Sequence, residues 1–353
     1  RGSRLREAGT VPRIPTPSYT LNDALGGGIP KGRITEVYGY EHTGKTSLAL
    51  GIAARVQQEG GTVAYVDVES SAAPGYFERM GVDLDRLILV TPRYGEQAMD
   101  IVEALARRNV DLVIVDSLAA LEPLSELSRS LRDPTVGRQA ALMSAAFRKI
   151  SAAYRESSTT LVFLNQVREQ VGALGDPTTT PGGRAIRFYA SVRIELRRVA
   201  YIKASAHEQG RSDDVAEADS HAKAAIVGME VLARVVKNRF GVPFRTAVIP
   251  IRFDRGIDTA EELLRLLMGK AIRASGAWFS VVDPVTGEPF GPDGEPLRFQ
   301  GRAALKEAIE LTPALRAFLE RCVGGPTAQA APSSSSGEPI KGRPGRPRRR
   351  AGR

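Results

Sequence analysis

The stretch Gly39–Thr46 (GYEHTGKT) constrains the fold of this chain more than any other. It fits the pattern G-x-x-x-x-G-K-[ST], in which the glycines let backbone N–H groups point at phosphate oxygens. The flanking residues agree, since Arg33–Tyr38 (RITEVY) predicts a strand and Thr46–Gln58 predicts a helix with its positive end toward the phosphates. A glycine-rich turn with a surface lysine would explain the glycines but not this strand–loop–helix context. The pattern therefore predicts a phosphate-binding P-loop and a bound nucleoside triphosphate.

We expect the residues of the loop to have distinct roles in nucleotide binding. Lys45 would reach the β- and γ-phosphates, and the Thr46 hydroxyl would be a ligand of Mg²⁺. We expect the nucleotide to contact the whole loop and the residue after it, namely Gly39, Tyr40, Glu41, His42, Thr43, Gly44, Lys45, Thr46 and Ser47.

Strand-like and helix-like segments alternate between residues 19 and 200. The strand-like segments are near-continuous apolar runs, which is typical of a parallel sheet covered on both faces. The expected fold class is therefore α/β, with a mostly parallel central sheet flanked by helices. The expected strands are Thr62–Val68, Asp111–Asp116, Thr160–Asn165 and Ala190–Arg197, and the expected helices are Gly95–Arg107 and Gly137–Arg155.

The chain divides into four expected parts: a loose N-terminal arm (1–18), a P-loop core (19–260), a small C-terminal α/β domain (261–323) and a disordered basic tail (324–353). Two further core strands are predicted at Glu230–Lys237 and Phe244–Phe253. The polar residues 203–228, which precede the first of these two strands, predict an insertion or a mobile loop. The small domain is expected to combine helices with a hairpin at Val281–Phe299.

Composition excludes several other classes of protein. The chain has 353 residues, with 42% hydrophobic and 25% charged residues, as in an ordinary soluble protein. No apolar run approaches the ~20 residues that cross a bilayer, and no signal peptide stands at the start, so we expect a cytoplasmic protein without a membrane partner. The single cysteine, Cys322, excludes intramolecular disulfides and zinc sites that need two cysteines.

The basic tail predicts contact with nucleic acid. Lys341–Arg353 carries seven basic residues and no acid, which accounts for seven of the nine net positive charges. The triplets Gly342-Arg343-Pro344 and Gly345-Arg346-Pro347 resemble AT-hooks, which lie in a narrow minor groove. The alternative is a nonspecific polycation that raises DNA affinity by counterion release.

Two carboxylates follow apolar strands at the edge where α/β proteins bind ligands. Asp116 ends one strand and would hold the Mg²⁺-bound water beside the P-loop. Glu69 follows the strand Thr62–Val68 and would polarise a water for attack on the γ-phosphate. Its rival is Asp67, which strand alternation points away from the face of Val66 and Val68.

A neutral amide, Gln166, follows a third strand, Thr160–Asn165. It would sense the γ-phosphate by hydrogen bonding and pass its position to the loop that follows. A polar strand end without function is the alternative for Gln166, as it is for Asp116 taken alone. The P-loop argues against that alternative for Asp116, whereas for Gln166 the residues alone leave the two interpretations equally favoured.

A series of segments from about residue 14 to 322 resembles the bacterial RecA recombinases. Two of them, Gly182–Arg193 (GGRAIRFYASVR) and Val235–Phe244 (VVKNRFGVPF), are far more specific than a P-loop. The others are Tyr19–Lys31 (YTLNDALGGGIPK), the P-loop, Val66–Glu69, Gly81–Leu87 (GVDLDRL), Gly95–Ala98 (GEQA), Leu112–Ala120 (LVIVDSLAA) and Asn165–Arg168 (NQVR).

The resemblance implies a DNA-dependent ATPase that forms ATP-bound helical filaments on single-stranded DNA and pairs it with double-stranded DNA for strand exchange and repair. It also implies activation of a self-cleaving repressor in the SOS response. It implies that Tyr76 stacks on adenine, that Phe253 closes the base pocket, and that Lys237 and Arg239 reach the neighbouring subunit's ATP. Such cations would neutralise charge on the γ-phosphoryl group.

Two loops are expected to touch DNA, near Arg132–Arg138 and at Arg168–Arg184. The second is rich in Gly, Thr and Pro, so it would order on a DNA backbone. Contacts would be largely independent of base sequence. The candidate contacts are Arg138, Arg148, Arg168, Val171, Gly182, Gly183 and Arg184, with Val136 as a second apolar wedge beside Val171.

Departures from the family pattern motivate a second reading. The N-terminal arm is short, Ala73 replaces an aspartate near adenine, Ala141 replaces an arginine, and 203–228 is longer than usual. The alternative is a RecA-like, ATP-gated regulator of repair that does not exchange strands. A third reading, a RadA/Sms-type branch-migration ATPase, shares the residues Lys237–Gly241 but has a four-cysteine zinc module, which one cysteine cannot build.

Overall fold

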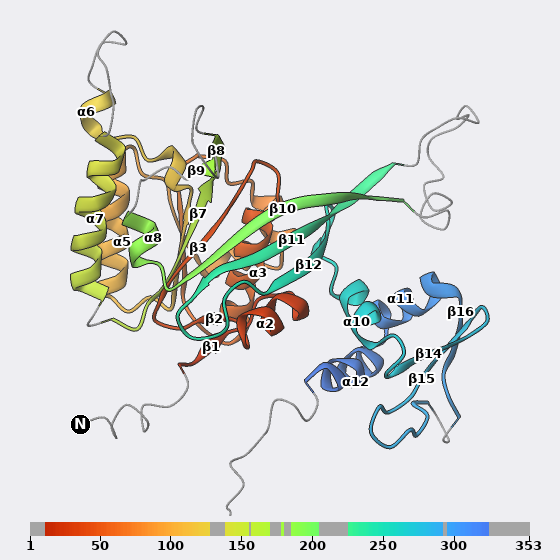
Figure 1. The fold of residues 1–353 in the computed structure, drawn as a ribbon. Coiled ribbons are helices and arrows are strands. Elements are labelled where there is room, and N and C mark those ends of the chain that lie inside the picture. Colours follow the sequence, from red (N-terminus) through yellow and green to blue (C-terminus); the bar gives the residue numbers. More distant parts are fainter. Residues whose placement is uncertain are drawn as a thin grey trace, which may run out of the picture.

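The computed structural model describes residues 11–127, 138–154, 157–169, 178–179, 185–204, 225–291 and 295–324. In this part of the chain, a nine-stranded sheet has the order β13-β12-β11-β10-β3-β7-β6-β4-β5 (Figure 1). Its strands are β3 (Ile34–Gly39), β4 (Val63–Asp67), β5 (Leu87–Val90), β6 (Leu112–Asp116), β7 (Thr160–Gln166), β10 (Val192–Lys203), β11 (Ile226–Asn238), β12 (Thr246–Arg252) and β13 (Gly256–Ile257).

The sheet combines a parallel part and an antiparallel part. Strands β10, β3, β7, β6, β4 and β5 run parallel to one another, whereas β11, β12 and β13 continue antiparallel from β10. The predicted α/β class with a mostly parallel sheet is confirmed. The apolar runs explain it, because β4 and β6 are buried along their whole lengths and need cover on both faces.

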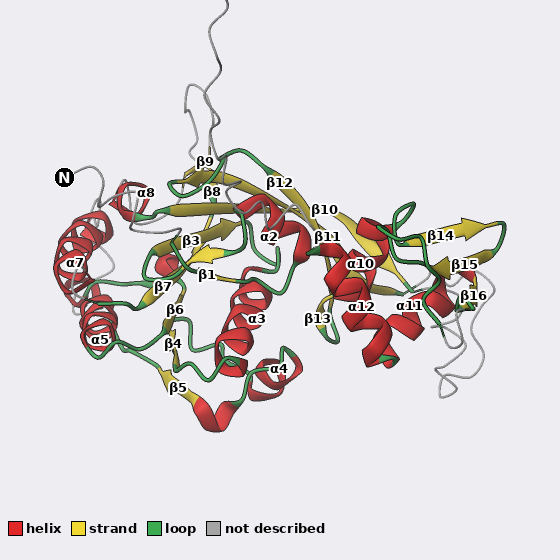
Figure 2. Ribbon diagram, turned by 90° about the horizontal axis from the view of Figure 1, so that it is seen from below, coloured by secondary structure: helices red, strands yellow, loops and turns green. Residues whose placement is uncertain are grey.

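Helices cover the two faces of the sheet and create two separate apolar cores. On one face, α3 (Lys45–Gln58) packs over a cluster that includes Val37 and Ile194. On the other face, α5, α7 and α8 cover a second cluster, in which Phe147 of α7 packs against Phe163 of β7 (Figure 2). The remaining helices of this unit are α2 (Tyr19–Leu25), α4 (Pro74–Arg79), α5 (Gly95–Arg107), α6 (Leu124–Leu127), α7 (Arg138–Tyr154) and α8 (Ala185–Tyr189).

The ends of the segment 203–228 differ from the prediction of an insertion or loop. Strand β10 runs to Lys203 and β11 starts at Ile226, and the two remain paired beyond Leu196, where β10 leaves β3. This two-stranded ribbon projects from the sheet in Figure 1. Pairing of the two strands with each other extends both into the segment, to Lys203 on one side and from Ile226 on the other. Residues 205–224 lie outside the described part.

The second half of the expected loose arm is in fact packed on the core, so that interpretation is wrong for residues 11–18. Strand β1 (Arg13–Ile14) pairs with β2 (Ile29–Pro30), and the Ile14 side chain is buried. Ser18 caps α2, because its side chain accepts a hydrogen bond from the Leu21 amide. Short segments such as this carry too few residues to show a period. Residues 1–10 lie outside the described part.

A third apolar cluster forms beyond the sheet from three helices and a three-stranded antiparallel sheet. The expected hairpin corresponds to β15 and β16, where Phe279 pairs with Phe299. We call these residues the C-terminal unit: α10 (Thr259–Leu267), β14 (Ile272–Ser275), β15 (Trp278–Val281), β16 (Arg298–Gln300), α11 (Gly301–Leu311) and α12 (Pro313–Val323). The expected disordered tail from residue 325 onward lies outside the described part.

The C-terminal unit is joined to the core at a junction made by Ser18, Tyr19, Thr20 and Glu262. Glu262 of α10 is buried, and its Oε1 accepts hydrogen bonds from the Ser18 and Thr20 hydroxyls at 2.6 and 2.5 Å. Its Oε2 accepts from the Tyr19 amide at 3.1 Å. The Tyr19 hydroxyl donates in turn to Glu320 of α12 at 2.6 Å.

No helix in the described residues is long and apolar enough to cross a membrane.

Candidate nucleotide site

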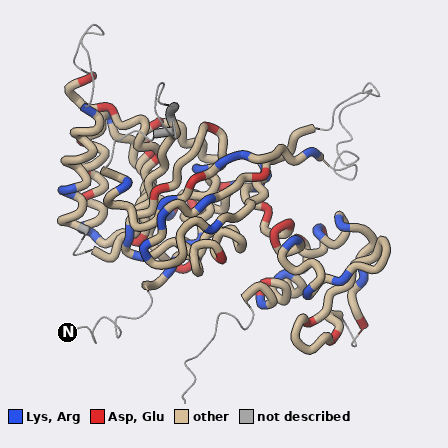
Figure 3. The backbone as a smooth tube through the Cα atoms, in the orientation of Figure 1, with Lys and Arg blue, Asp and Glu red and all other residues tan. Residues whose placement is uncertain are grey.

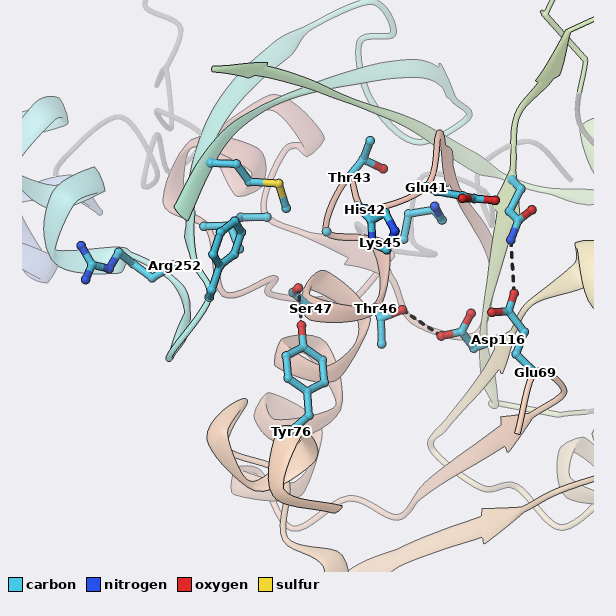
Figure 4. Close-up of a pocket in the computed structure, with 15 residues that line it drawn as sticks. Glu41, His42, Thr43, Lys45, Thr46, Ser47, Glu69, Tyr76, Asp116 and Arg252 are labelled. Atoms are coloured by element: carbon cyan, nitrogen blue, oxygen red, sulfur yellow. Dashed lines mark hydrogen bonds between the residues drawn. The ribbon is translucent and has the colours of Figure 1, made fainter. Parts of the chain in front are cut away.

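A cavity of about 560 Å³ opens at the carboxyl ends of β3, β4, β6 and β7. We call it the nucleotide cavity. The P-loop lies at its centre, with Glu69 and Asp116 on one side and Tyr76 on the other (Figure 4). Its lining residues are Glu41, His42, Thr43, Gly44, Lys45, Thr46, Ser47, Glu69, Tyr76, Asp116, Gln166, Met229, Ile251, Arg252 and Phe253.

The two fixed glycines of the P-loop are required by close packing as well as by backbone conformation. A Cβ on Gly39 would lie 2.3 Å from the Leu196 carbonyl oxygen, so β3 and β10 could not approach as they do. Gly44 has φ of +80°, and a Cβ there would lie 2.4 Å from Ile251 Cδ1. Gly44 also precedes the first residue of α3, so the helix N-terminus faces the cavity.

Lys45 folds back over the loop that it follows. Its Nζ donates to the carbonyl oxygens of Tyr40 at 2.7 Å and Gly39 at 3.2 Å. Burial lowers the pKa of Lys45, while Asp116, Glu69 and Glu41 act in the opposite direction. The ammonium group therefore sits among carboxylates at the place where phosphates would enter. Gly39 and Tyr40 contribute these carbonyls but do not line the cavity.

Asp116 is held beside the first turn of α3. Its Oδ2 accepts hydrogen bonds from Thr46 Oγ1 at 2.9 Å and from the Tyr65 hydroxyl at 2.6 Å. Burial is the largest cause of a raised pKa at Asp116, and the negative charges of Glu69 and Asp67 raise it further. Three carboxylates near one another favour a cation at this point.

Oxygen atoms of this kind fit Mg²⁺. A hydroxyl from Thr46 and a carboxylate from Asp116 are hard ligands, and Mg²⁺ usually keeps several waters and takes the rest of its ligands from phosphates. Accordingly, the described residues contain no cluster of three His, Cys, Asp or Glu side chains that would hold a metal by themselves. The pair is suited to a metal that arrives with a nucleotide.

Glu69 points into the cavity and is held from two sides. Ser117 Oγ donates to Glu69 Oε1 at 2.5 Å, and Gln166 Nε2 donates to the same oxygen at 3.4 Å. Its rival Asp67 is buried and accepts from the Ser71 and Ala72 amides, so it shapes the turn after β4 and does not line the cavity. Of these two carboxylates, Glu69 is therefore the one that faces the cavity.

The side of the cavity near Tyr76 is mostly apolar. Tyr76 of α4 shares a 2.6 Å hydrogen bond with Ser47, which fixes its ring at the edge of the cavity. Phe253, which also lines the cavity, is half exposed. Met229 of β11 and Ile251 of β12 complete the wall, whereas Arg252 points away in Figure 4 and donates to Asp254 at 3.3 Å.

The chain matches known proteins over most of its length. The model of the RecA N-terminal domain matches residues 4–258. The chain belongs to the RecA family. Protein RecA of Nautilia profundicola is 42% identical over 316 residues, which cover 88% of this chain and 82% of that protein. Protein RecA of Staphylococcus aureus is 42% identical over 310 residues, 87% and 81% of the two chains.

RecA membership makes this a protein of DNA recombination and repair, as its sequence predicted. It favours the first of the three readings over the branch-migration ATPase. The family-implied cations lie outside the nucleotide cavity of their own chain. Lys237 Nζ donates to the Arg187 and Phe188 carbonyl oxygens at 2.8 and 3.3 Å, and Arg239 donates to that of Phe188 at 3.0 Å.

The RecA-like DNA contacts are only partly within the described residues. Arg138 and Arg148 lie on α7, and Arg148 is exposed. Arg168 starts the short strand β8 (Arg168–Glu169), which pairs with β9 (Thr178–Thr179). Val136, Val171, Gly182, Gly183 and Arg184 lie outside the described residues, so the structure does not bring the DNA candidates together.

Several residues of the site were missed by reasoning from sequence. Tyr65 and Ser117 hold the two carboxylates, and Met229, Ile251 and Arg252 line the cavity. A signal existed for Ser117, which directly follows Asp116, and for Ile251 and Arg252, which precede Phe253. Tyr65 and Met229 stand inside apolar strands, where nothing in the sequence distinguishes them from core residues.

Proposed function

We propose that this RecA-family chain is a Mg²⁺-dependent, DNA-stimulated ATPase that assembles into a filament on single-stranded DNA and pairs it with a duplex. The observation that carries the proposal is the Glu69 carboxylate, held between Ser117 and Gln166 in the same cavity as the P-loop lysine. A strand-edge carboxylate beside Lys45 provides the means of hydrolysis as well as binding.

In the hydrolytic step, Glu69 accepts a proton from a water whose oxygen forms a bond to the γ-phosphorus. The bond from that phosphorus to the β,γ-bridging oxygen breaks, giving ADP and inorganic phosphate. Lys45 and the N–H groups of the loop neutralise charge on the phosphate oxygens. Mg²⁺, held by Thr46 and through water by Asp116, would screen the same charge. Gln166 reports the γ-phosphate to β8 and the residues that follow.

The filament supplies the rest of the site. Lys237 and Arg239 would reach the γ-phosphate of the neighbouring subunit, so that ATP acts both as substrate and as a bond between protomers. Their distance from their own cavity supports this arrangement in trans. Tyr76 and Phe253 would enclose the adenine. A self-cleaving repressor is a further proposed partner, and a protein acting on chromosomal DNA would work at the nucleoid in the cytoplasm.

Strand exchange between circular single-stranded DNA and a linear duplex tests the proposal. With ATP and Mg²⁺, the wild-type chain should form joint molecules and the Lys45→Ala variant should form none. DNA-stimulated hydrolysis without joint molecules would identify a regulator instead. A Lys237→Ala/Arg239→Ala variant should lose DNA-stimulated hydrolysis, and normal turnover in that variant would remove the cations from the site.

A further inference from the structure

Three buried polar residues, Glu36, Arg193 and Asn165, form a row that crosses the centre of the sheet beneath α8. Glu36 of β3 is fully buried, and its Oε2 accepts a hydrogen bond from Arg193 Nε of β10 at 2.5 Å. Asn165 of β7, also fully buried, donates from Nδ2 to the other oxygen of Glu36 at 3.0 Å. Acidic and basic segments lie close together on these central strands in Figure 3. An ion pair this deep is costly to maintain, which indicates a use for it.

A bulge brings Lys237 onto the same face as this row. Arg193 pairs with Lys237 across β10 and β11, but the next residue, Ile194, pairs with Val235. Val236 is therefore an extra residue, and it turns Lys237 away from the core face of Val235. As a result, Lys237 contacts the carbonyl end of α8 next to Arg193, and does not enter the apolar cluster under α3.

The row also begins at the nucleotide cavity. Asn165 directly precedes Gln166, and Asn165 Oδ1 accepts a hydrogen bond from the backbone N–H of Gln166 at 3.0 Å. Gln166 in turn donates to Glu69. The Arg193 guanidinium lies 4.6 Å from the centre of the Tyr38 ring, which together with Glu36 fixes its plane. The contacts therefore run without a break from Glu69 to the residue beside Lys237.

We propose that Glu36, Arg193 and Asn165 are positioning residues that link the chain's own ATP site to the cation that it offers to the next subunit. The inference rests on the proposed function, because it requires Lys237 to act in trans. The three residues touch no phosphate in this arrangement. They set the position and charge of Lys237, and movement of Gln166 reaches that lysine through Asn165, Glu36 and Arg193.

Electrostatics give the proposal a distinctive readout. Burial lowers the pKa of Lys237 to about 8, with the charges of Arg239 and Arg193 adding to the decrease and Glu36 opposing it. From α8, the ammonium is contacted by the backbone carbonyl oxygens of Arg187 and Phe188. Lys237 is charged below its pKa and neutral above it. DNA-dependent ATP hydrolysis should therefore have an alkaline limb, a range in which the rate falls as pH rises and Lys237 loses its proton.

The test is the pH at which the rate of ATP hydrolysis falls in this alkaline limb, compared between the wild type and variants of Glu36 and Arg193. Arg193→Gln removes a positive neighbour, so the limb should move to higher pH, by about half a pH unit. Glu36→Gln removes a negative neighbour, so the limb should move to lower pH. A purely structural role would lower turnover in both variants without shifting the limb in opposite directions. Alkaline limbs that lie at the wild-type pH in both variants would overturn the proposal.

Two further variants keep the test decisive if an unpaired buried charge prevents folding. Glu36→Gln/Arg193→Gln leaves no unpaired charge, and its limb should lie between those of the wild type and Arg193→Gln. Lys237→Arg keeps the cation but removes its titration, so the alkaline limb should disappear. A limb that persists in Lys237→Arg belongs to another group and contradicts the inference.

Cooperativity toward ATP tests the part of the row that connects the nucleotide cavity to Glu36 through Asn165. Asn165→Ala should lower the Hill coefficient for ATP toward one, because Gln166 then loses its connection to Glu36. An unchanged Hill coefficient would show that the nucleotide site and Lys237 are not linked through Asn165. The outcomes separate the two proposals, since a wild-type chain without DNA-dependent hydrolysis contradicts the proposed function itself. An active wild type with unmoved limbs contradicts only the positioning role.

Discussion

Asp116 in the nucleotide cavity and Glu262 at the junction are both buried carboxylates whose pKa burial raises. Their surroundings differ. Both oxygens of Glu262 accept hydrogen bonds, from two hydroxyls and a backbone amide, and these bonds oppose the increase in pKa. Asp116 accepts its two hydrogen bonds on one oxygen and has Glu69 and Asp67 as negative neighbours.

The comparison shows how one residue type serves two purposes. At the junction, donors from α2 satisfy the carboxylate and thereby fix the C-terminal unit against the core. In the cavity, Asp116 stands among the charges of Glu69, Asp67 and the Lys45 ammonium, and the excess of carboxylates favours a further cation. Burial by itself therefore does not identify a functional carboxylate; the donors and charges around it do. The predictions below test this distinction, beginning with the largest expected effect.

Glu69→Gln should lower DNA-stimulated ATP turnover by at least ~10²-fold, because the amide cannot accept the proton of the attacking water. ATP binding should be retained, since Gln keeps the shape and the hydrogen bond from Ser117. Steady-state hydrolysis and nucleotide-binding titration check the two halves. Glu78→Gln, an exposed change on the neighbouring helix α4, is the matched control and should hydrolyse ATP normally. Normal turnover in Glu69→Gln would mean that another group accepts the proton.

Asp116→Asn should remove most of the stabilisation that Mg²⁺ and ATP give the wild type, which is about 2.7 kcal/mol at a ligand concentration 100-fold above Kd. Without Mg²⁺ and ATP, the variant should unfold at the same temperature as the wild type or a higher one. The asparagine oxygen still accepts from Thr46 and Tyr65, and one of three clustered charges is gone. Thermal unfolding with and without Mg²⁺ and ATP measures both effects. An undiminished ligand effect would show that Asp116 does not serve the metal.

Glu262→Gln should destabilise the fold by about 1–3 kcal/mol, in contrast to Asp116→Asn. The new NH₂ group would face the Tyr19 amide, so one buried donor would lose its acceptor. Urea unfolding followed by far-ultraviolet circular dichroism gives the free energy of unfolding. Thr312→Ser, at the exposed start of α12, is a suitable control within the C-terminal unit. A variant as stable as the wild type would mean that the junction does not depend on the carboxylate.

The smallest expected effect is a dependence of the Glu262 contribution on pH. Because burial raises its folded-state pKa above the unfolded value, its stabilising contribution is complete below the unfolded pKa and is lost as pH rises through the folded pKa. The stability difference between wild type and Glu262→Gln should therefore be larger at pH 5 than at pH 8. Urea titrations at the two pH values measure it, and a difference that grows with pH would reverse the assigned cause.

Much of the parallel part of the sheet was accessible from sequence. Helix α5 has the predicted bounds, Gly95–Arg107, and four of the predicted strands differ from β3, β4, β6 and β7 by no more than one residue at either end. Long apolar runs and P-loop spacing are local signals, so they survive without tertiary information. Segments held by distant partners were mispredicted. The residues 11–18 and the end of β10 owe their structure to pairing with β2 and β11.

The sequence by itself determined the P-loop, the α/β class and the residue types that end the strands, because each follows from local spacing and from the parallel sheet. Only the tertiary structure decided which of those residues act together. It placed Glu69 rather than Asp67 beside the P-loop, gave Asp116 its partner Tyr65, and put Arg193 between Glu36 and Lys237. These relations depend on strand order, register and a one-residue bulge, which join residues as far apart in the chain as Glu36 and Arg193 and leave no periodic trace in it.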